Sequence, residues 1–317
     1  MGVRHINFDP LIHKIKENNW EVHGMEVYYI GHGGQSAGSD KPCSGQERIY
    51  VYGDVTAHRY PIYSATKTIT SLAVGMAADE GKMDIGRSVL AYIPEKILSA
   101  LPEEAKERYQ KVTIKRLLTM SVPGFPFRPE GESWLRNSLQ YPVEPEKTVF
   151  DYSNVSAYLA GVAAANALEE DLYAYLQRQL FQPLGIENPP FQRCPDGYFY
   201  GASGMELTVN ELSRIGFVLM DEGLYQGKRI LSEKYVKEAC GIRQMNREGG
   251  YGYFVWKYQD GFRISGKWGQ RCYIFPRRGL MVTYLAHMEE GSEQLADCMW
   301  EMIADLRTGS LQLSEYR

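Results

Sequence analysis

The sequence has little of what marks nucleic-acid-binding, metal-binding or disulfide-rich proteins. Its net charge is −4 and its Lys and Arg residues are scattered, so no basic stripe is available for binding phosphates. The six histidines show neither His-Glu-x-x-His nor another metal-ligand spacing. The five cysteines lie far apart and never in Cys-x-x-Cys spacing, which argues against a disulfide framework or a zinc knuckle. We therefore expect no nucleic-acid partner, no metal and no other cofactor.

Long apolar runs are missing as well. The stretch from Met1 to Trp20 lacks the unbroken apolar segment of a signal peptide, because charged residues interrupt it. No later segment is long enough to span a membrane. The sequence therefore predicts a cytoplasmic protein with no membrane partner.

The length of the chain, 317 residues, exceeds that of a typical single-core domain. Hydrophobic residues make up 44% of it and charged residues 23%, as in ordinary folded proteins. We expect two lobes that share an interface.

Strand-like patterns occur near both ends of the chain. Two stretches of β-branched and aromatic residues, Met25–Ile30 and Arg48–Tyr52, flank a segment rich in Gly and Ser and predict a hairpin. After Gly249 the pattern returns as short segments separated by turns, and a helix from about Ser292 to Arg307 closes the chain. These later predicted strands are Gly252–Tyr258, Phe262–Ser265, Tyr273–Pro276 and Leu280–Ala286.

Helical patterns dominate the middle of the chain. The first helix is predicted from Ser64 to Glu80, with Gly81 as its C-cap. A loop from Ser121 to Lys147 contains five prolines, and a loop of that length is typical of a lid or a cleft wall. Further helices are predicted at Ile114–Met120, Ser156–Ala167, Leu172–Phe181, Val209–Asp221 and Glu233–Cys240.

The order of these elements predicts an α+β fold. Residues 1–82 and 241–317 are expected to form one lobe, in which an antiparallel sheet is flanked by helices. Residues 83–240 are expected to form a mostly helical lobe inserted into the first. We expect the cleft between the lobes to hold the functional residues.

The segment Ser64-Ala65-Thr66-Lys67 is the only Ser-x-x-Lys in the chain. On a helix, a spacing of three places the Ser64 hydroxyl and the Lys67 amine on one face, about 5–6 Å apart at Cβ. A serine hydroxyl needs such a neighbouring base to become a nucleophile. Burial or a nearby cation would lower the pKa of Lys67 enough for this role. Taken alone, however, the tetrad is more often an N-cap with a solvated lysine.

A second element, Tyr152-Ser153-Asn154, precedes a predicted helix. A phenol near an ammonium can carry a proton to a leaving group, and an Asn amide can hydrogen-bond both a substrate carbonyl and the lysine. The alternative is a helix-start turn, since Asn and Ser are common there.

A third element, Lys267-Trp268-Gly269-Gln270, lies between two predicted strands. Lys267 could supply a cation near Tyr152, and Gln270 could supply a backbone N–H for an oxyanion. Gly269 would let a substrate approach the backbone closely. The alternative is a charged turn between strands.

In this order the three elements resemble the serine β-lactamase and penicillin-binding-protein superfamily, most closely its class C, esterase and 6-aminohexanoate-oligomer hydrolase branches. The resemblance implies a β-lactamase/transpeptidase-like fold and Ser64 as the acylated nucleophile. It also implies Lys67 as base, Tyr152 as general acid and base, and Lys267 at the third-motif cation site. Asn154, Trp268, Gly269 and Gln270 are implied as substrate-binding residues.

Two departures from the family pattern concern the substrate. Trp268 stands where penicillin-processing enzymes carry a small hydroxyl residue, which weakens the case for a β-lactam. No clear Glu-x-x-Leu-Asn segment is present of the kind that positions the deacylating water in class A enzymes. Deacylation would therefore depend on Tyr152 and Lys67.

A competing esterase motif is present in Gly34-Gln35-Ser36-Ala37-Gly38. Gly-x-Ser-x-Gly requires a strand, a sharp turn and a helix, but Ser39-Asp40-Lys41-Pro42 follows and cannot begin that helix. We interpret the segment as a hairpin loop.

The sequence thus predicts a serine hydrolase that cleaves a small-molecule ester or amide through a Ser64 acyl-enzyme. Trp134, Tyr141 and Trp268 are expected to line its cleft. The alternative is a penicillin-binding or β-lactam-sensing protein that is acylated without efficient turnover.

Overall fold

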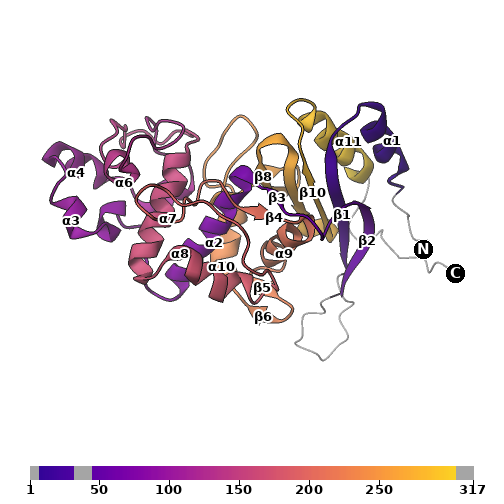
Figure 1. Cartoon of the computed structure of the whole chain (residues 1–317), viewed down its shortest axis with the longest axis horizontal. Helices are drawn as coiled ribbons and strands as arrows, with labels where there is room; N and C mark the ends of the chain where they lie inside the picture. Colours follow the sequence, from indigo (N-terminus) through magenta and orange to yellow (C-terminus); the bar gives the residue numbers. More distant parts are fainter. Residues whose placement is uncertain (1–6, 32–44, 305–317) are drawn as a thin grey trace.

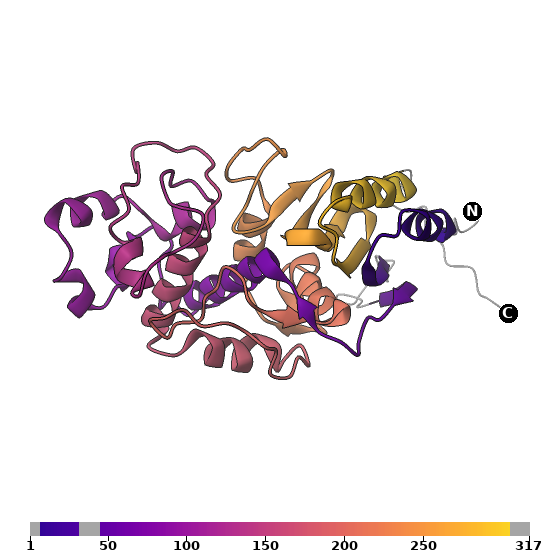
Figure 2. The same cartoon turned by 45° about the horizontal axis from the view of Figure 1, so that its top comes forward.

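The computed structural model of the chain describes residues 7–31 and 45–304, which form the arrangement of Figures 1 and 2. Their largest sheet is six-stranded, antiparallel between neighbours, and has the order β2-β1-β10-β9-β8-β7. N-terminal and C-terminal strands therefore share one sheet, as the sequence predicted. The strands are β1 (Val22–Gly31), β2 (Gly45–Gly53), β7 (Trp256–Tyr258), β8 (Gly261–Gly266), β9 (Gln270–Phe275) and β10 (Leu280–Ala286).

Helices cover both faces of this sheet. On one face, α1 (Asp9–Glu17) and α11 (Ser292–Ala304) lie side by side and share a core with β1, β9 and β10 (Figure 1). On the other face, α9 (Val209–Met220) packs against β9 and β10. Every residue of β9 and β10 is buried, because apolar layers contact both faces of the sheet.

The helix α9 belongs to residues 83–240, which were expected to form the helical lobe, yet it packs on the sheet. Gly216 allows this close approach, since a Cβ there would lie 2.6 Å from the Cys272 sulfur. A capping box fixes the start of the helix: the Thr208 hydroxyl accepts from the Glu211 N–H, and the Glu211 carboxylate accepts from the Thr208 N–H. The sheet therefore takes one of its covering helices from the stretch 83–240 that was expected to form the helical lobe.

Two helices that are buried almost all round form the centre of the other lobe. These are α2 (Thr66–Asp79) and α7 (Asn154–Leu168), which pack against each other. Their runs of Ala, Gly, Ser and Thr permit a close approach, and helices without a polar face are typical of a core. Around them lie α3 (Glu95–Leu98), α4 (Glu103–Tyr109), α5 (Ile114–Leu118), α6 (Trp134–Ser138), α8 (Leu172–Leu176) and α10 (Glu233–Cys240).

Two of the predicted elements are interrupted in the structure. The predicted strand Gly252–Tyr258 is reduced to β7, because Phe254 has a left-handed backbone (φ 56°) that interrupts an extended chain. The predicted helix Leu172–Phe181 is α8 followed by a π-helical turn at Gln177–Phe181. The Gly-x-Ser-x-Gly segment at 34–38 lies outside the described residues.

Candidate active site

Ser64 lies in a single 3-10 turn, Tyr63–Ala65, that leads directly into α2. Before it, β3 (Tyr60–Pro61) pairs with β4 (Glu206–Leu207), and the Ile62 N–H donates to the Met205 carbonyl over 2.9 Å. The turn packs against β8 and β9. Ser64 therefore stands where the helical lobe meets the sheet, rather than in the first turn of the α-helix itself.

The Lys67 amine makes three hydrogen bonds at the centre of the site. Its side chain is 1% exposed, and its Nζ lies 3.0 Å from Ser64 Oγ, 2.6 Å from Asn154 Oδ1 and 2.9 Å from the Ala202 carbonyl oxygen. Burial lowers the pKa of Lys67 well below its ordinary value, since a desolvated ammonium is costly. Burial thus shifts Lys67 toward the neutral amine that general-base chemistry requires.

The three partners of Lys67 differ in what they can accept or donate. The Asn154 and Ala202 oxygens can only accept, so each takes one N–H of the Lys67 amine. The third hydrogen bond is donated by the amine to Ser64 Oγ over 3.0 Å, so loss of that proton would leave a lone pair beside the Ser64 hydroxyl. This arrangement suits proton removal from Ser64.

Asn154 is held in place by the loop that the sequence predicted to be a cleft wall. Its backbone N–H donates to the Phe127 carbonyl over 2.7 Å, and the Ser153 hydroxyl donates to the Pro126 carbonyl over 2.6 Å. Ser153 is also the N-cap of α7, since its hydroxyl accepts from the Val155 N–H. The second motif is thus a helix start as well as part of the site.

Tyr152 lies beside the amine. The Lys67 Nζ is 4.9 Å from the centre of the Tyr152 ring, which stacks on Trp256 at a centroid distance of 5.7 Å. Burial raises the pKa of Tyr152 above its ordinary value, and a hydrogen bond with Ser64 acts in the opposite direction. Tyr152 is therefore a neutral phenol at pH 7, with a proton to donate.

A segment that no sequence motif marked completes the surroundings of Lys67. The Ala202 carbonyl accepts from Lys67, and the preceding Gly201 carbonyl accepts from the Thr70 hydroxyl over 2.7 Å. The Tyr200 hydroxyl is hydrogen-bonded with the Asn154 amide, which counteracts the rise in the pKa of Tyr200 caused by burial. Thr70 lies one helical turn beyond Lys67 on α2.

The structure places the third motif differently from the expectation. The Lys267 side chain is exposed, and its Nζ lies 3.9 Å from the centre of the Trp268 ring. In the described part of the chain it forms no hydrogen bond with Tyr152. Trp268 has a left-handed backbone (φ 60°). An ammonium over an indole keeps its hydration and gains a cation–π contact. The structure thus brings Ser64, Lys67, Tyr152 and Asn154 together, but not the Lys267 ammonium.

The other residues of this motif lie closer to the site or inside the fold. Trp268 packs edge-on against Tyr63, the residue before Ser64, at 5.2 Å. Gly269 is buried with φ 90°, where other residues are strained. The Gln270 side chain is 1% exposed and its amide donates to the Ala286 carbonyl on β10.

The two other aromatic residues expected in the cleft pack within the helical lobe. Trp134 lies edge-on to Tyr200 at a centroid distance of 5.1 Å, and Tyr200 in turn is hydrogen-bonded with Asn154. Tyr141 packs edge-on against Phe125 at 6.5 Å, away from the contacts of Lys67.

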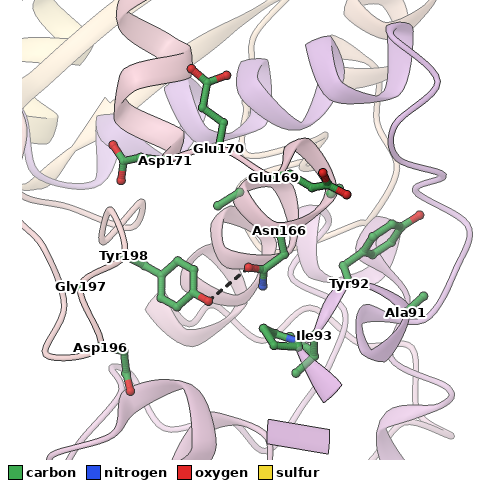
Figure 3. A pocket seen from close by; sticks show the side chains of 13 residues that line it. Ala91, Tyr92, Ile93, Asn166, Glu169, Glu170, Asp171, Asp196, Gly197 and Tyr198 are labelled. Carbon is green, nitrogen blue, oxygen red and sulfur yellow. Dashed lines mark hydrogen bonds between the residues drawn. The ribbon is translucent and has the colours of Figure 1, made fainter. Parts of the chain in front are cut away.

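A separate hollow of about 760 Å³ lies on the helical lobe (Figure 3). Its lining includes four carboxylates, and the Tyr198 hydroxyl donates to Asn166 Oδ1 within it. Three of these carboxylates already have partners: Asp171 pairs with Arg193, Glu170 pairs with Arg178, and Asp196 accepts from the Leu135 N–H and the Ser133 hydroxyl. Arginines thus neutralise two of the carboxylates and hydrogen bonds hold a third, and the hollow is lined by none of the residues around Lys67.

Across residues 7–31 and 45–304, no group of three or more His, Cys, Asp and Glu side chains is placed to hold a metal ion. In the same ranges, none of the helices has the length and apolar character needed to cross a bilayer.

The Beta-lactamase family model matches residues 22–300, which include both the sheet and the residues around Lys67. The chain belongs to the Beta-lactamase family. Among solved structures, a protein from Bacillus anthracis assigned as a 6-aminohexanoate-dimer hydrolase superposes with a TM-score of 0.69 at 18% identity, over 96% of this chain and 83% of that one. A β-lactamase/D-alanine carboxypeptidase from Pseudomonas syringae superposes with a TM-score of 0.67 at 16% identity, over 94% and 99%. At such identities the likeness concerns the fold.

One curated relative is Protein flp of Staphylococcus aureus. It is 23% identical over 161 residues, which cover 47% of this chain and 31% of flp. The matched part is thus about a third of the length of that relative. The predicted α+β, β-lactamase/transpeptidase-like fold is confirmed by the family match and the superpositions.

Proposed function

We propose that the protein is a serine hydrolase that cleaves an ester or amide through an acyl-enzyme on Ser64. The observation that carries this proposal is the buried Lys67 amine, which is hydrogen-bonded to two carbonyl oxygens and, over 3.0 Å, to the Ser64 hydroxyl. A lysine whose pKa is lowered by burial beside a serine hydroxyl is typical of a functional site.

In the proposed reaction, Lys67 removes the Ser64 proton while Oγ bonds to the substrate carbonyl carbon. The backbone N–H groups of Ser64 and Gln270 would stabilise the oxyanion. As the tetrahedral intermediate collapses, the bond to the leaving group breaks, and Tyr152 donates its proton to that group and is reprotonated by Lys67. Water, deprotonated by the same pair, then attacks the acyl carbon and releases the acid and Ser64. The chemistry needs no metal.

Asn154 would position the substrate as well as Lys67, and Trp268, which packs against Tyr63, would contact the substrate beside Ser64. Lys267 takes no part in the proposed proton transfers, because its ammonium lies over the Trp268 ring. Should substrate binding turn this side chain inward, it would supply the expected cation.

The test is Ser64→Ala with a chromogenic ester such as p-nitrophenyl acetate. We expect turnover to fall by at least about a thousandfold, since Ser64 supplies the hydroxyl bonded to Lys67 among residues 7–31 and 45–304, while the thermal midpoint stays near that of the wild type. Intact-mass analysis after a fluorophosphonate should show one adduct in the wild type and none in the variant. Equal activity in both proteins would end the proposal.

The alternative of a penicillin-binding or sensing protein uses the same Ser64 and Lys67. The time course of product release distinguishes a hydrolase from a penicillin-binding or sensing protein. Continuous release indicates a hydrolase, whereas a burst of about one equivalent, with a stable penicilloyl adduct by mass, indicates acylation without turnover.

A further inference from the structure

A cavity of about 320 Å³ lies between α9, α10 and the β7 side of the sheet. Its lining comes from the end of α9, from α10, from residues 257–262 around the β7–β8 turn, and from the 3-10 turn Pro276–Arg278. None of the residues around Lys67 belongs to this lining, so the cavity is separate from the candidate active site.

The buried part of the lining is apolar. Leu219, Val236 and Phe262 are buried, and they belong to the same core as α2 and α7. Met220 and Cys240 also line the cavity and are partly exposed. Burial raises the pKa of the Cys240 thiol, which therefore stays neutral and behaves as a small apolar group. An apolar ligand group would thus find a rigid apolar surface inside the cavity.

The carboxylates of the lining already have partners. The Glu222 carboxylate pairs with the Lys237 ammonium over 3.4 Å. Both oxygens of Asp260 accept from Arg278 Nε, at 3.1 and 2.9 Å. The negative charge at the cavity is therefore neutralised by the protein itself.

Two cations of the lining have no such partner. Lys257 and Arg277 form no ion pair among residues 7–31 and 45–304. The Lys257 Nζ donates to the Gly261 carbonyl over 2.8 Å, which occupies one of its three N–H groups. Burial lowers the pKa of Lys257, Asp260 acts in the opposite direction, and Arg277 acts in the same direction as burial. A partly desolvated ammonium beside a second cation is stabilised by a bound anion.

This excess of positive charge is local, because the whole chain has a net charge of −4. It is found at the opening of a cavity whose interior is apolar. A ligand that fits both parts has a negatively charged group at one end and an apolar body at the other.

We propose that this cavity binds a small organic anion, namely a monocarboxylate with an unbranched apolar body of about six carbons. Arg277 and Lys257 bind the carboxylate, since the planar fork of an arginine matches its two oxygens. The body lies against the apolar side chains named above. A short body is expected because the volume is at the lower end of the range for small-molecule sites. The inference does not depend on the chemistry proposed at Ser64.

The experiment is a calorimetric titration of the full chain with hexanoate at pH 7. We expect a Kd of about 1 mM, typical for a ligand with few non-hydrogen atoms. Two further ligands separate the contributions of charge and of apolar contact. 1-Hexanol, which lacks the charge, and acetate, which lacks the body, should each bind at least about tenfold more weakly than hexanoate.

Substitutions locate the bound acid. Lys257→Met keeps an apolar stem but removes the charge, and it should weaken hexanoate binding at least about fivefold while leaving 1-hexanol unaffected. Arg277→Gln, on an exposed turn, should have a similar effect and serves if the first variant does not fold. The matched control is Lys96→Met on α3, an exposed lysine at the far end of the helical lobe from α10 (Figure 1), which should bind hexanoate as the wild type does.

Three results would overturn the proposal. Hexanoate binding that is absent up to about 50 mM would show that the cavity holds no such ligand. Binding that ignores both Lys257→Met and Arg277→Gln would place the acid elsewhere on the protein. Inorganic phosphate binding as tightly as hexanoate, with the same dependence on Lys257, would indicate a plain anion site that makes no use of the apolar interior.

Discussion

The substitution Asn154→Asp tests the protonation state on which the proposed chemistry depends. It replaces the amide oxygen 2.6 Å from the Lys67 amine by a carboxylate of the same shape. A carboxylate beside an amine favours the ammonium form and therefore raises the pKa of Lys67. An ammonium has no lone pair for Ser64, so the variant should need a higher pH to become active.

The size of the shift in the pKa of Lys67 follows from the distance between the amine and the new carboxylate. Two unit charges about 4 Å apart interact by about 4 kcal/mol at an effective dielectric constant of 20, which corresponds to about three pKa units. Burying the new carboxylate, at a position that is 7% exposed, offsets part of this gain. We therefore expect the pKa of Lys67 to rise by about one to three units relative to the wild type.

The assay is kcat/KM for a chromogenic ester between pH 5 and pH 10. The wild-type acid limb, where Lys67 loses its proton, lies well below the ordinary lysine pKa because burial lowers it. In Asn154→Asp this limb should move to higher pH by about one to three units, with a fall of about tenfold or more at any pH below the wild-type limb. Activity should recover as the pH rises through the new value.

A matched control is available on the same helix. Asn166→Asp introduces a carboxylate on α7 where the side-chain oxygen accepts from Tyr198, with no lysine as partner. Its acid limb should coincide with that of the wild type. An acid limb of Asn154→Asp within about 0.3 units of the wild type, together with reduced activity, would refute the assignment of Lys67 as the base.

Three further substitutions test neighbouring parts of the structure. Lys67→Met should reduce acylation by about 10²–10⁴, the usual contribution of a general base, as followed by the mass of the fluorophosphonate adduct over time; labelling at the wild-type rate would contradict the mechanism. Lys267→Ala should keep kcat/KM within about threefold, because the ammonium is exposed over Trp268, and a hundredfold loss would show that it enters the site with substrate. Thr208→Ala should lower the free energy of unfolding by about 1 kcal/mol through loss of the α9 cap, measured by urea denaturation, with Thr208→Ser as the variant that restores it.

The arrangement of strands and helices was largely predictable, because it depends on patterns that repeat along the chain. The predicted helices near Ser156–Ala167 and Val209–Asp221 correspond to α7 and α9. The exceptions have local causes that composition does not reveal, such as the left-handed backbone at Phe254. The packing of α9 on the sheet was not predicted, since it depends on a contact between Gly216 and a strand far along the chain.

By itself the sequence determined that a serine and a lysine lie on one side of a helix start, because a spacing of three residues sets their separation whatever surrounds them. Only the tertiary structure decided the partners of that lysine. The Ala202 carbonyl is chemically the same as every other backbone carbonyl, so no residue type could mark it, and its approach to within 2.9 Å of the amine depends on the fold of distant segments. The direction of the Lys267 side chain was likewise decided by its surroundings, since a long exposed side chain follows the contacts that its neighbours offer.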